Sequence, residues 1–236
     1  MMKVEIWSDI MCPFCYIGKR RFEAALEQFP GKGDITVEWK SFQLDPSLKS
    51  QPGVDVYDHL AEKKGQSREW SLAMHEQVTG MAREAGLTYN FDKAVIANSF
   101  DAHRLIQLAK QHQLGDTAEE RLFRAYFTEG KDMSDPQVLL EIGTEIGLPK
   151  AAIEALLHSG DMAAAVKHDV QEAEQLGIRG VPFFVLDRKF GVSGAQPVEA
   201  FTQALEKAHG EWKKTQPVQS FDTLDGEVCT PDGNCG

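Results

Sequence analysis

The apolar and polar positions in the first 45 residues predict a strand, a helix and a second strand. Residues 4–7 are β-branched and aromatic, which favours a short strand. Apolar residues then recur at helical spacing over 22–29, until Pro30 and Gly31 end the run. Residues 35–40 alternate between apolar and polar, which predicts a strand with one buried face.

From about residue 55 to 160 the apolar positions follow a helical period instead. This predicts a series of amphipathic helices, the longest from about residue 92 to 113. Asp116 and Glu119 have the spacing of a capping box for the next helix. Ser134, which precedes Pro136 closely, is the predicted cap of a later one. The aromatic and methionine stripes on these helices are interpreted as core.

The last third of the pattern returns to mixed helix and strand. A helix is predicted over 161–176, and residues 183–186 are apolar on both faces, as expected of a central strand. Pro182 is compatible with the first position of that strand. Residues 187–189 predict a hairpin turn, 190–195 the returning strand, and Pro197 begins a last helix. The predicted order is β-α-β, a helical insert, then α-β-β-α.

Cys12 and Cys15, separated by Pro13 and Phe14, lie where the first strand gives way to the first helix. Pro13 suits a first helical turn. The free N–H groups and the dipole at a helix start stabilise a thiolate. Cys15 follows one turn later, within reach of a disulfide with Cys12. We therefore expect Cys12 to attack or be attacked, and Cys15 to resolve the mixed disulfide. A zinc half-site or two structural thiols are the alternatives, and the strand-to-helix setting favours redox chemistry.

Composition and charge narrow the function classes. The 236 residues carry a net charge of −11, which argues against nucleic acid and anionic membranes as partners. The chain enters its first strand without an apolar leader, and it holds no run of about 18 apolar residues. We expect a cytoplasmic protein that is neither exported nor membrane-spanning. In such a reducing compartment, paired cysteines are usually catalytic.

The stretch SDIMCPFCYIG at residues 8–18 resembles the DsbA branch of the thioredoxin superfamily, and its cytoplasmic FrnE-like members in particular. Similar stretches occur at residues 42–46, 98–105, 122–130 and 177–196. The resemblance implies an α/β fold, a thioredoxin fold with a large all-helical insertion and a C-terminal extension. The thioredoxin-like domain is expected at 1–45 plus 161–209, the insertion at 46–160 and the extension at 210–236.

The resemblance also implies an activity, that of a thiol-disulfide oxidoreductase or protein disulfide isomerase. Its substrates would be protein or small-molecule disulfides and thiols. No cofactor is expected beyond the redox-active disulfide, with glutathione as a candidate co-substrate and no metal. The oligomeric state and the direction of the reaction are left open.

The same resemblance assigns further site residues. Pro182 would follow a cis peptide bond and pack beside the two cysteines, and the backbone of Val181 would pair with the substrate chain. A trans proline that merely begins a strand is the alternative. Pro13 and Phe14 are assigned to the same substrate-binding surface.

Asn98 and His103 are further candidates for substrate binding. Asn98 falls on an apolar stripe of the predicted helix over 92–113, together with Ala102, Leu105 and Ala109. A buried amide needs partners, so Asn98 could line a cleft against the thioredoxin domain, and His103 could join it. A bridging buried amide and a surface histidine are the alternatives.

A second cysteine pair, Cys229 and Cys235, lies in the C-terminal extension. The Pro-Asp-Gly turn at 231–233 can bring the two thiols together. They are interpreted as a structural disulfide, as idle thiols, or as a second redox pair that exchanges with Cys12 and Cys15. Some FrnE-like proteins have a similar pair, which favours the relay. A zinc site built from all four cysteines is a further alternative.

Two other function classes compete with the oxidoreductase. One is a glutathione-dependent enzyme similar to 2-hydroxychromene-2-carboxylate isomerase, suggested by residues 98–105. Such relatives generally lack the paired cysteines that this chain has. The other is a zinc-stabilised or chaperone-like binding module. No H-E-x-x-H, Walker, G-x-S-x-G or dinucleotide-binding motif is present in the sequence.

Overall fold

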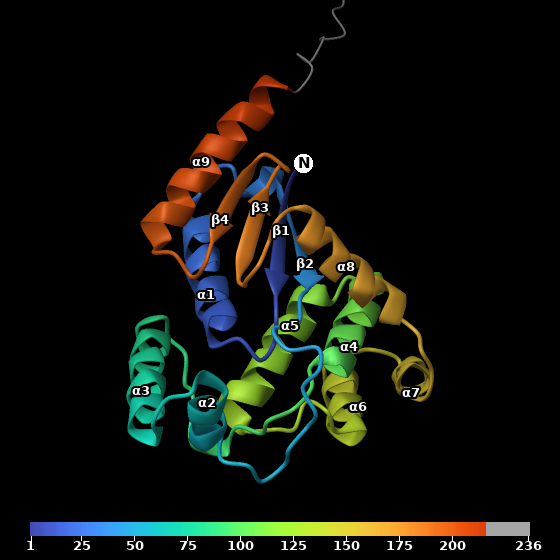
Figure 1. The fold of residues 1–236 in the computed structure, drawn as a ribbon. Helices are drawn as coiled ribbons and strands as arrows, with labels where there is room; N and C mark the ends of the chain where they lie inside the picture. Colours follow the sequence, from blue (N-terminus) through green and yellow to red (C-terminus); the bar gives the residue numbers. More distant parts are fainter. Residues whose placement is uncertain (216–236) are drawn as a thin grey trace, which may run out of the picture.

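The computed structural model describes residues 1–215 and contains one mixed four-stranded sheet (Figure 1). Its strands are β1 (Met2–Ser8), β2 (Ile35–Ser41), β3 (Phe183–Leu186) and β4 (Phe190–Ser193), in the order β2-β1-β3-β4. β1 and β2 are parallel and are connected by α1 (Pro13–Gln28), whereas β3 is antiparallel to both its neighbours. This is the β-α-β and β-β arrangement that the sequence pattern predicts.

Helices cover both faces of the sheet (Figure 1). α1 and α9 (Val198–Lys214) lie side by side on one face, where Phe22, Phe184 and Phe201 meet in an aromatic cluster. α8 (Ala163–Gln175) covers part of the other face, and its Ala173 packs with Trp7. The central strand β1 therefore has buried side chains on both of its faces, as expected of a strand in a sheet that is covered on both sides.

The chain between β2 and α8 forms a separate helical layer, seen in the lower half of Figure 1. It contains α2 (Val56–Lys64), α3 (Arg68–Glu84), α4 (Phe100–Gln111), α5 (Gly115–Arg124), α6 (Pro136–Glu145) and α7 (Lys150–His158), with a π-helical turn at Ala125–Glu129. Its apolar core includes residues from the loop before α1 and from the first turns of that helix, namely Ile10, Cys12, Cys15, Tyr16 and Ile17. The redox motif is therefore packed into the core of the insertion as well as attached to the sheet.

The predicted fold class is confirmed: a thioredoxin fold with a helical insertion. The division into residue ranges remains a prediction, and the extension at 216–236 lies outside the described residues. Among residues 1–215, no helix is both long and apolar enough to cross a membrane.

Three predicted helix starts are wrong. α4 begins at Phe100, because residues 91–93 form a 3-10 turn and Ile96 makes a β-bridge to Gln51. Asp116 lies within the first turn of α5 and not at its cap, since its carboxylate accepts a hydrogen bond from Trp39 Nε1 at 2.9 Å. Tertiary partners override the local signal in both places.

The third error is a shift of one residue in the predicted cap of α6. Asp135 caps α6 by accepting a hydrogen bond from the backbone N–H of Gln137 at 2.8 Å. Ser134 instead donates its hydroxyl hydrogen bond to Asp132. Ser and Asp are both favourable N-cap residues. Because Pro136 is the first helical residue, the N-cap position falls on Asp135, directly before it.

Candidate active site

Two thiols mark the start of α1. Cys12 occupies the N-cap, with φ −92° and ψ 112°, and Pro13 is the first helical residue. The backbone N–H of Cys12 donates to the carbonyl of Asp9 at 2.9 Å, and that of Cys15 donates to the carbonyl of Cys12 at 3.0 Å. This tight turn places Cys12 at the mouth of the helix and Cys15 behind it. Both are free thiols, 3% and 1% exposed.

The segment that precedes β3 faces the first thiol. The Val181–Pro182 peptide bond is cis, as the resemblance implies. The Cys12 thiol donates to the carbonyl oxygen of Val181 at 3.5 Å. The carbonyl of Pro182 accepts from Gly194 at 2.8 Å, which ties the loop to β4. The structure thus brings together three of the residues singled out in the sequence: Cys12, Val181 and Pro182.

The second thiol, Cys15, is hard to ionise. Burial raises the pKa of Cys15 well above its ordinary value, and the neighbouring Cys12 raises it further. The backbone of Asp9 and the hydroxyl of Ser8 lower the pKa of Cys15, but less than burial raises it. Cys15 is therefore a protonated thiol in the reduced protein at neutral pH.

Aromatic residues from the insertion contact the first turn of α1, which carries the cysteine motif. Tyr89 donates its hydroxyl hydrogen bond to the carbonyl of Pro13 at 2.7 Å. Tyr16 stacks on Phe123 with ring centroids 4.8 Å apart, and Tyr89 stacks on Phe127 at 4.4 Å. Because these rings are rigid, they restrict how far the first turn of α1 can shift.

A cavity of about 460 Å³ opens beside the motif. Pro13 and Phe14 line it, and Phe14 is 37% exposed. The remaining walls are mostly apolar and come from α2, α3, the π-helical turn and the loop after β2, with His59, Lys63 and Lys64 on the α2 side. The size and apolar lining are those of a site for a small molecule or a side chain. Their role in substrate binding stays a prediction.

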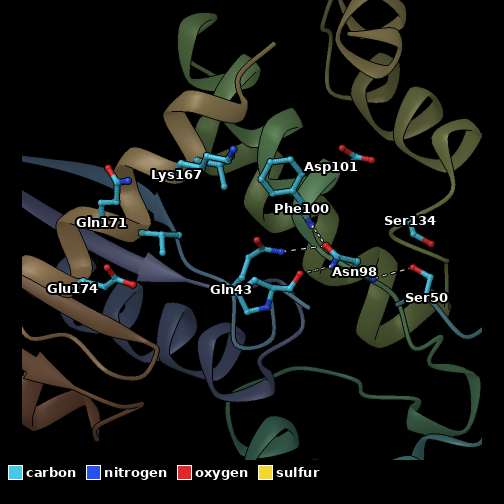
Figure 2. Close-up of a pocket in the computed structure, with 12 residues that line it drawn as sticks. Gln43, Ser50, Asn98, Phe100, Asp101, Ser134, Lys167, Gln171 and Glu174 are labelled. Atoms are coloured by element: carbon cyan, nitrogen blue, oxygen red, sulfur yellow. Dashed lines mark hydrogen bonds between the residues drawn. The ribbon is translucent and has the colours of Figure 1, made fainter. Parts of the chain in front are cut away.

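Asn98 borders a different hollow, of about 770 Å³, shown in Figure 2. Its amide oxygen accepts from Gln43 at 3.2 Å and from the backbone N–H of Phe100 at 2.9 Å. Its amide nitrogen donates to the carbonyls of Pro46 and Leu48. The side chain thus fastens the loop after β2, which separates the two hollows. Asn98 precedes α4, so the predicted helical stripe is wrong at this residue.

His103 is buried, at 1% exposed, so the alternative of a surface histidine is wrong. Its Nε2 lies 3.4 Å from Oδ1 of Asp9, and its Nδ1 has no hydrogen-bond partner among residues 1–215. Asp9 also accepts from the backbone N–H of Leu44 at 2.7 Å. Neither Asn98 nor His103 lines the cavity beside Pro13 and Phe14.

Two buried polar residues were missed by the sequence interpretation. Ser8 ends β1 and Glu119 lies on α5, and each is 1% exposed. Glu119 was assigned to a capping box. Its spacing of three, four and seven residues to Leu122, Phe123 and Tyr126 was the signal that it shares their buried face.

In the described part of the chain, one group of side chains has the spacing that could hold a metal ion. It lies on α8 and consists of His168, Asp169 and Glu172. Lys40 pairs with Asp169 at 3.3 Å and with Glu172 at 3.2 Å, so these carboxylates already have a cation. Cys229 and Cys235 lie outside the described residues. The four-cysteine zinc site and the second redox pair are therefore not tested by the structure.

Comparisons with known proteins agree with this geometry. A protein-family model described as DSBA-like thioredoxin domain matches residues 3–206. The chain is similar to a probable DsbA oxidoreductase from Streptomyces coelicolor, with 40% identity, 100% and 99% of the two chains covered, and a TM-score of 0.83. The cytosolic disulfide reductase DsbM from Pseudomonas aeruginosa shares the fold, with 20% identity, 89% and 99% covered, and a TM-score of 0.63.

A curated relative, the uncharacterized protein YwbO of Bacillus subtilis, is 29% identical over 207 residues, which is 86% of this chain and 94% of YwbO. A 2-hydroxychromene-2-carboxylate isomerase also shares the fold, at 15% identity, with 91% and 100% covered and a TM-score of 0.63.

Proposed function

The chain belongs to the family of DSBA-like thioredoxin domains, and on that premise we propose that it is a thiol-disulfide oxidoreductase whose redox centre is Cys12 and Cys15. The observation that carries the proposal is the placement of the two thiols. Cys12 caps α1 next to the Val181 carbonyl, and Cys15 lies buried one turn behind it. A zinc half-site would not need this asymmetry between its two ligands.

The reaction follows from that asymmetry. The Cys12 thiolate attacks a substrate disulfide, forms a mixed disulfide and releases one substrate thiolate. Cys15 then loses its proton and attacks the Cys12 sulfur, which forms the Cys12–Cys15 disulfide and releases the second substrate thiolate. Two electrons pass from the cysteine pair to the substrate. Run backwards, the same steps oxidise a substrate dithiol.

The substrate would lie across Val181 and Phe14. Val181 offers backbone groups beside the reacting sulfur, so an extended substrate segment could pair with it in the manner of an added strand. Phe14 is the exposed residue of the motif, and with Pro13 it forms the edge of the apolar cavity. Protein disulfides would use both surfaces, and isomerase activity would follow from capture of a wrong pairing.

A FrnE-like, cytoplasmic role and glutathione as co-substrate are the finer parts of the proposal. They are supported by the resemblance around residues 8–18 and by the likeness to a cytosolic reductase, DsbM, of which a structure with GSH exists. The relay to Cys229 and Cys235 rests on sequence alone. It requires that either thiol reach the Cys12–Cys15 disulfide.

The test compares turnover of a model disulfide protein, in both reductase and isomerase assays, for three proteins. These are the wild type, Cys12→Ser and the double variant Cys229→Ser/Cys235→Ser. Cys12→Ser should abolish turnover, because no other described thiol is at the helix mouth. Full activity in Cys12→Ser, or none in the wild type, would refute the proposal. A further drop in the double variant would support the relay, and unchanged turnover would count against it.

Metal analysis of protein purified without chelator addresses the binding-module alternative. About one zinc per chain would refute redox use of the cysteines, because bound thiolates are not free to exchange.

A further inference from the structure

Gly18 of α1 is the point at which the loop that carries Pro182 rests on the helix. A Cβ at Gly18 would lie 3.0 Å from Cγ of Pro182 and 3.5 Å from both Cα and Cβ of Ala195. The first distance is shorter than carbon atoms normally keep without a bond. Because the proline ring is closed onto its own backbone, it cannot rotate away, and the loop itself would have to shift. Gly18 therefore sets how closely this loop approaches α1.

Arg21, almost one turn further along α1, fastens the same loop. Its Nη1 donates a hydrogen bond to the carbonyl oxygen of Ala195 at 2.7 Å. No other hydrogen bond or ion pair of the Arg21 side chain is present among residues 1–215. A hydrogen bond from a charged guanidinium is stronger than one between neutral groups. Arg21 therefore holds the loop at the distance that Gly18 permits.

Backbone contacts connect Ala195 to the reacting sulfur. Gly194, directly before Ala195, donates its N–H hydrogen bond to the carbonyl of Pro182 at 2.8 Å. The preceding residue, Val181, has its carbonyl oxygen 3.5 Å from Sγ of Cys12. Cys12 is the N-cap of the helix on which this loop rests. A shift of the loop on α1 therefore changes the distance between the Val181 backbone and Cys12.

We propose that Gly18 and Arg21 are positioning residues that set the spacing between Cys12 and the Val181 backbone, and with it the preference for extended peptide disulfides over small ones. The inference rests on the proposed function and adds to it the residues that align the substrate. An extended segment must pair with the Val181 backbone while its sulfur is within reach of Cys12. A small disulfide without a peptide backbone needs only the Cys12 thiolate.

A role in stability alone would give a different result. Loss of the contacts of Gly18 or Arg21 would then lower the urea midpoint of unfolding. The remaining folded protein would react with both kinds of disulfide in the same ratio as the wild type. The ratio of the two rate constants therefore separates positioning of the substrate from support of the fold.

The experiment measures the first attack on two disulfides. Full-length reduced protein carrying Cys229→Ser/Cys235→Ser, so that one cysteine pair reacts, is mixed with each in turn. One is the disulfide-linked dimer of an uncharged, extended peptide of about ten residues. The other is 2-hydroxyethyl disulfide. The Cys12 thiolate attacks a disulfide sulfur, the mixed disulfide forms and a substrate thiolate leaves. Acid quenching and mass spectrometry of the released thiol give the second-order rate constants.

Three variants and one control are compared in this background. Gly18→Ala adds the methyl group that displaces the loop. Arg21→Met keeps an unbranched side chain and removes the hydrogen-bond donor, whereas Arg21→Lys retains a donor. Gly80→Ala is the matched control, because Gly80 also lies within a helix, α3, and a Cβ there meets nothing within 4 Å.

Gly18→Ala and Arg21→Met should each slow the reaction with the peptide disulfide by about five-fold or more, and change that with 2-hydroxyethyl disulfide by less than about two-fold. Arg21→Lys should recover part of the loss, and Gly80→Ala should resemble the wild type with both substrates. A ratio of rate constants that stays within about two-fold of the wild-type ratio in Gly18→Ala and Arg21→Met would overturn the inference. A Lys variant as slow as the Met variant would refute the role of the Arg21 hydrogen bond.

Two further outcomes are decisive. If Gly18→Ala does not fold, Arg21→Met decides, because Arg21 is only half-buried and its loss leaves the packing of α1 in place. A wild type that reacts with neither disulfide would overturn the proposed function and the inference together. A wild type that reacts with both, beside variants that keep its ratio, would overturn the inference alone.

Discussion

At the scale of single residues, the burial of the Glu119 carboxyl has a cost in the free energy of unfolding. A carboxyl that is ionised in the unfolded chain at pH 5–6 must take up a proton to fold there, or else be buried as an anion. The folded protein bears this cost because α5 supplies Leu122 and Phe123 to the same core.

The first prediction concerns stability against pH. Burial raises the pKa of Glu119 to about 7 in the folded protein. Its favourable contribution to the free energy of unfolding is therefore fully present below the pKa that Glu119 has in the unfolded chain, and it is lost as the pH rises through about 7. Glu119→Gln should therefore unfold at higher urea concentration than wild type at pH 8, by on the order of 1–3 kcal/mol, and differ little at pH 4. Urea unfolding at both pH values measures this, and a variant less stable at pH 8 would contradict it.

At the scale of elements, the π-helical turn Ala125–Glu129 shapes the wall beside the redox motif. It follows α5 directly, and its Tyr126 and Phe127 line the cavity next to Pro13 and Phe14. The turn ends at Gly130, with φ 70°, and the N–H of Lys131 donates to the carbonyl of Ala125 at 2.9 Å. π-helical turns of this kind often occur at functional sites because they redirect the side chains that follow.

The second prediction concerns Gly130. A Cβ at this position would lie 2.5 Å from Cβ and 2.6 Å from the carbonyl oxygen of Lys93, so the turn and the 3-10 segment would have to separate. Gly147 also has a positive φ, 93°, but a Cβ there meets nothing within 4 Å. Gly147→Ala should cost about 1–2 kcal/mol from backbone strain alone. Gly130→Ala should cost roughly 1–3 kcal/mol more, from the clash. Equal costs in chemical denaturation would contradict this account.

At the scale of the whole molecule, α1 joins the sheet and the insertion into one unit. Its Phe22 and Ala25 belong to the core under α9, whereas Cys15, Tyr16 and Ile17 belong to the core of the insertion. One helix cannot leave one core without disturbing the other. The chain is therefore expected to unfold in a single cooperative step despite its two layers.

The third prediction follows, and fluorine NMR can test it. The four tryptophans, labelled with 5-fluorotryptophan, include Trp7 in the sheet and Trp70 on α3 of the insertion. Their folded resonances should disappear at the same urea concentration. Earlier loss of the Trp70 signal would show that the insertion unfolds independently, and it would support the sequence-based domain boundaries as folding units.

A structural feature of this protein could be predicted from the sequence when the residues that determine it are close together along the chain. The strands, the hairpin and the cysteine motif follow from periods of two and 3.6 residues and from a proline and a turn close by in sequence. The start of α4 was misplaced because a bridge to Gln51, more than 40 residues away, holds Ile96 outside the helix.

The sequence by itself determined the element order, the fold class and the two thiols at the start of α1, because each depends on neighbours within a few residues. Only the tertiary structure decided that His103 is buried beside Asp9, that Asn98 fastens a loop, and that the Glu119 side chain is buried. Those residues lie on α4, α5 and the loops around them. Their surroundings are created when the insertion packs against the end of β1, and no local pattern encodes that contact.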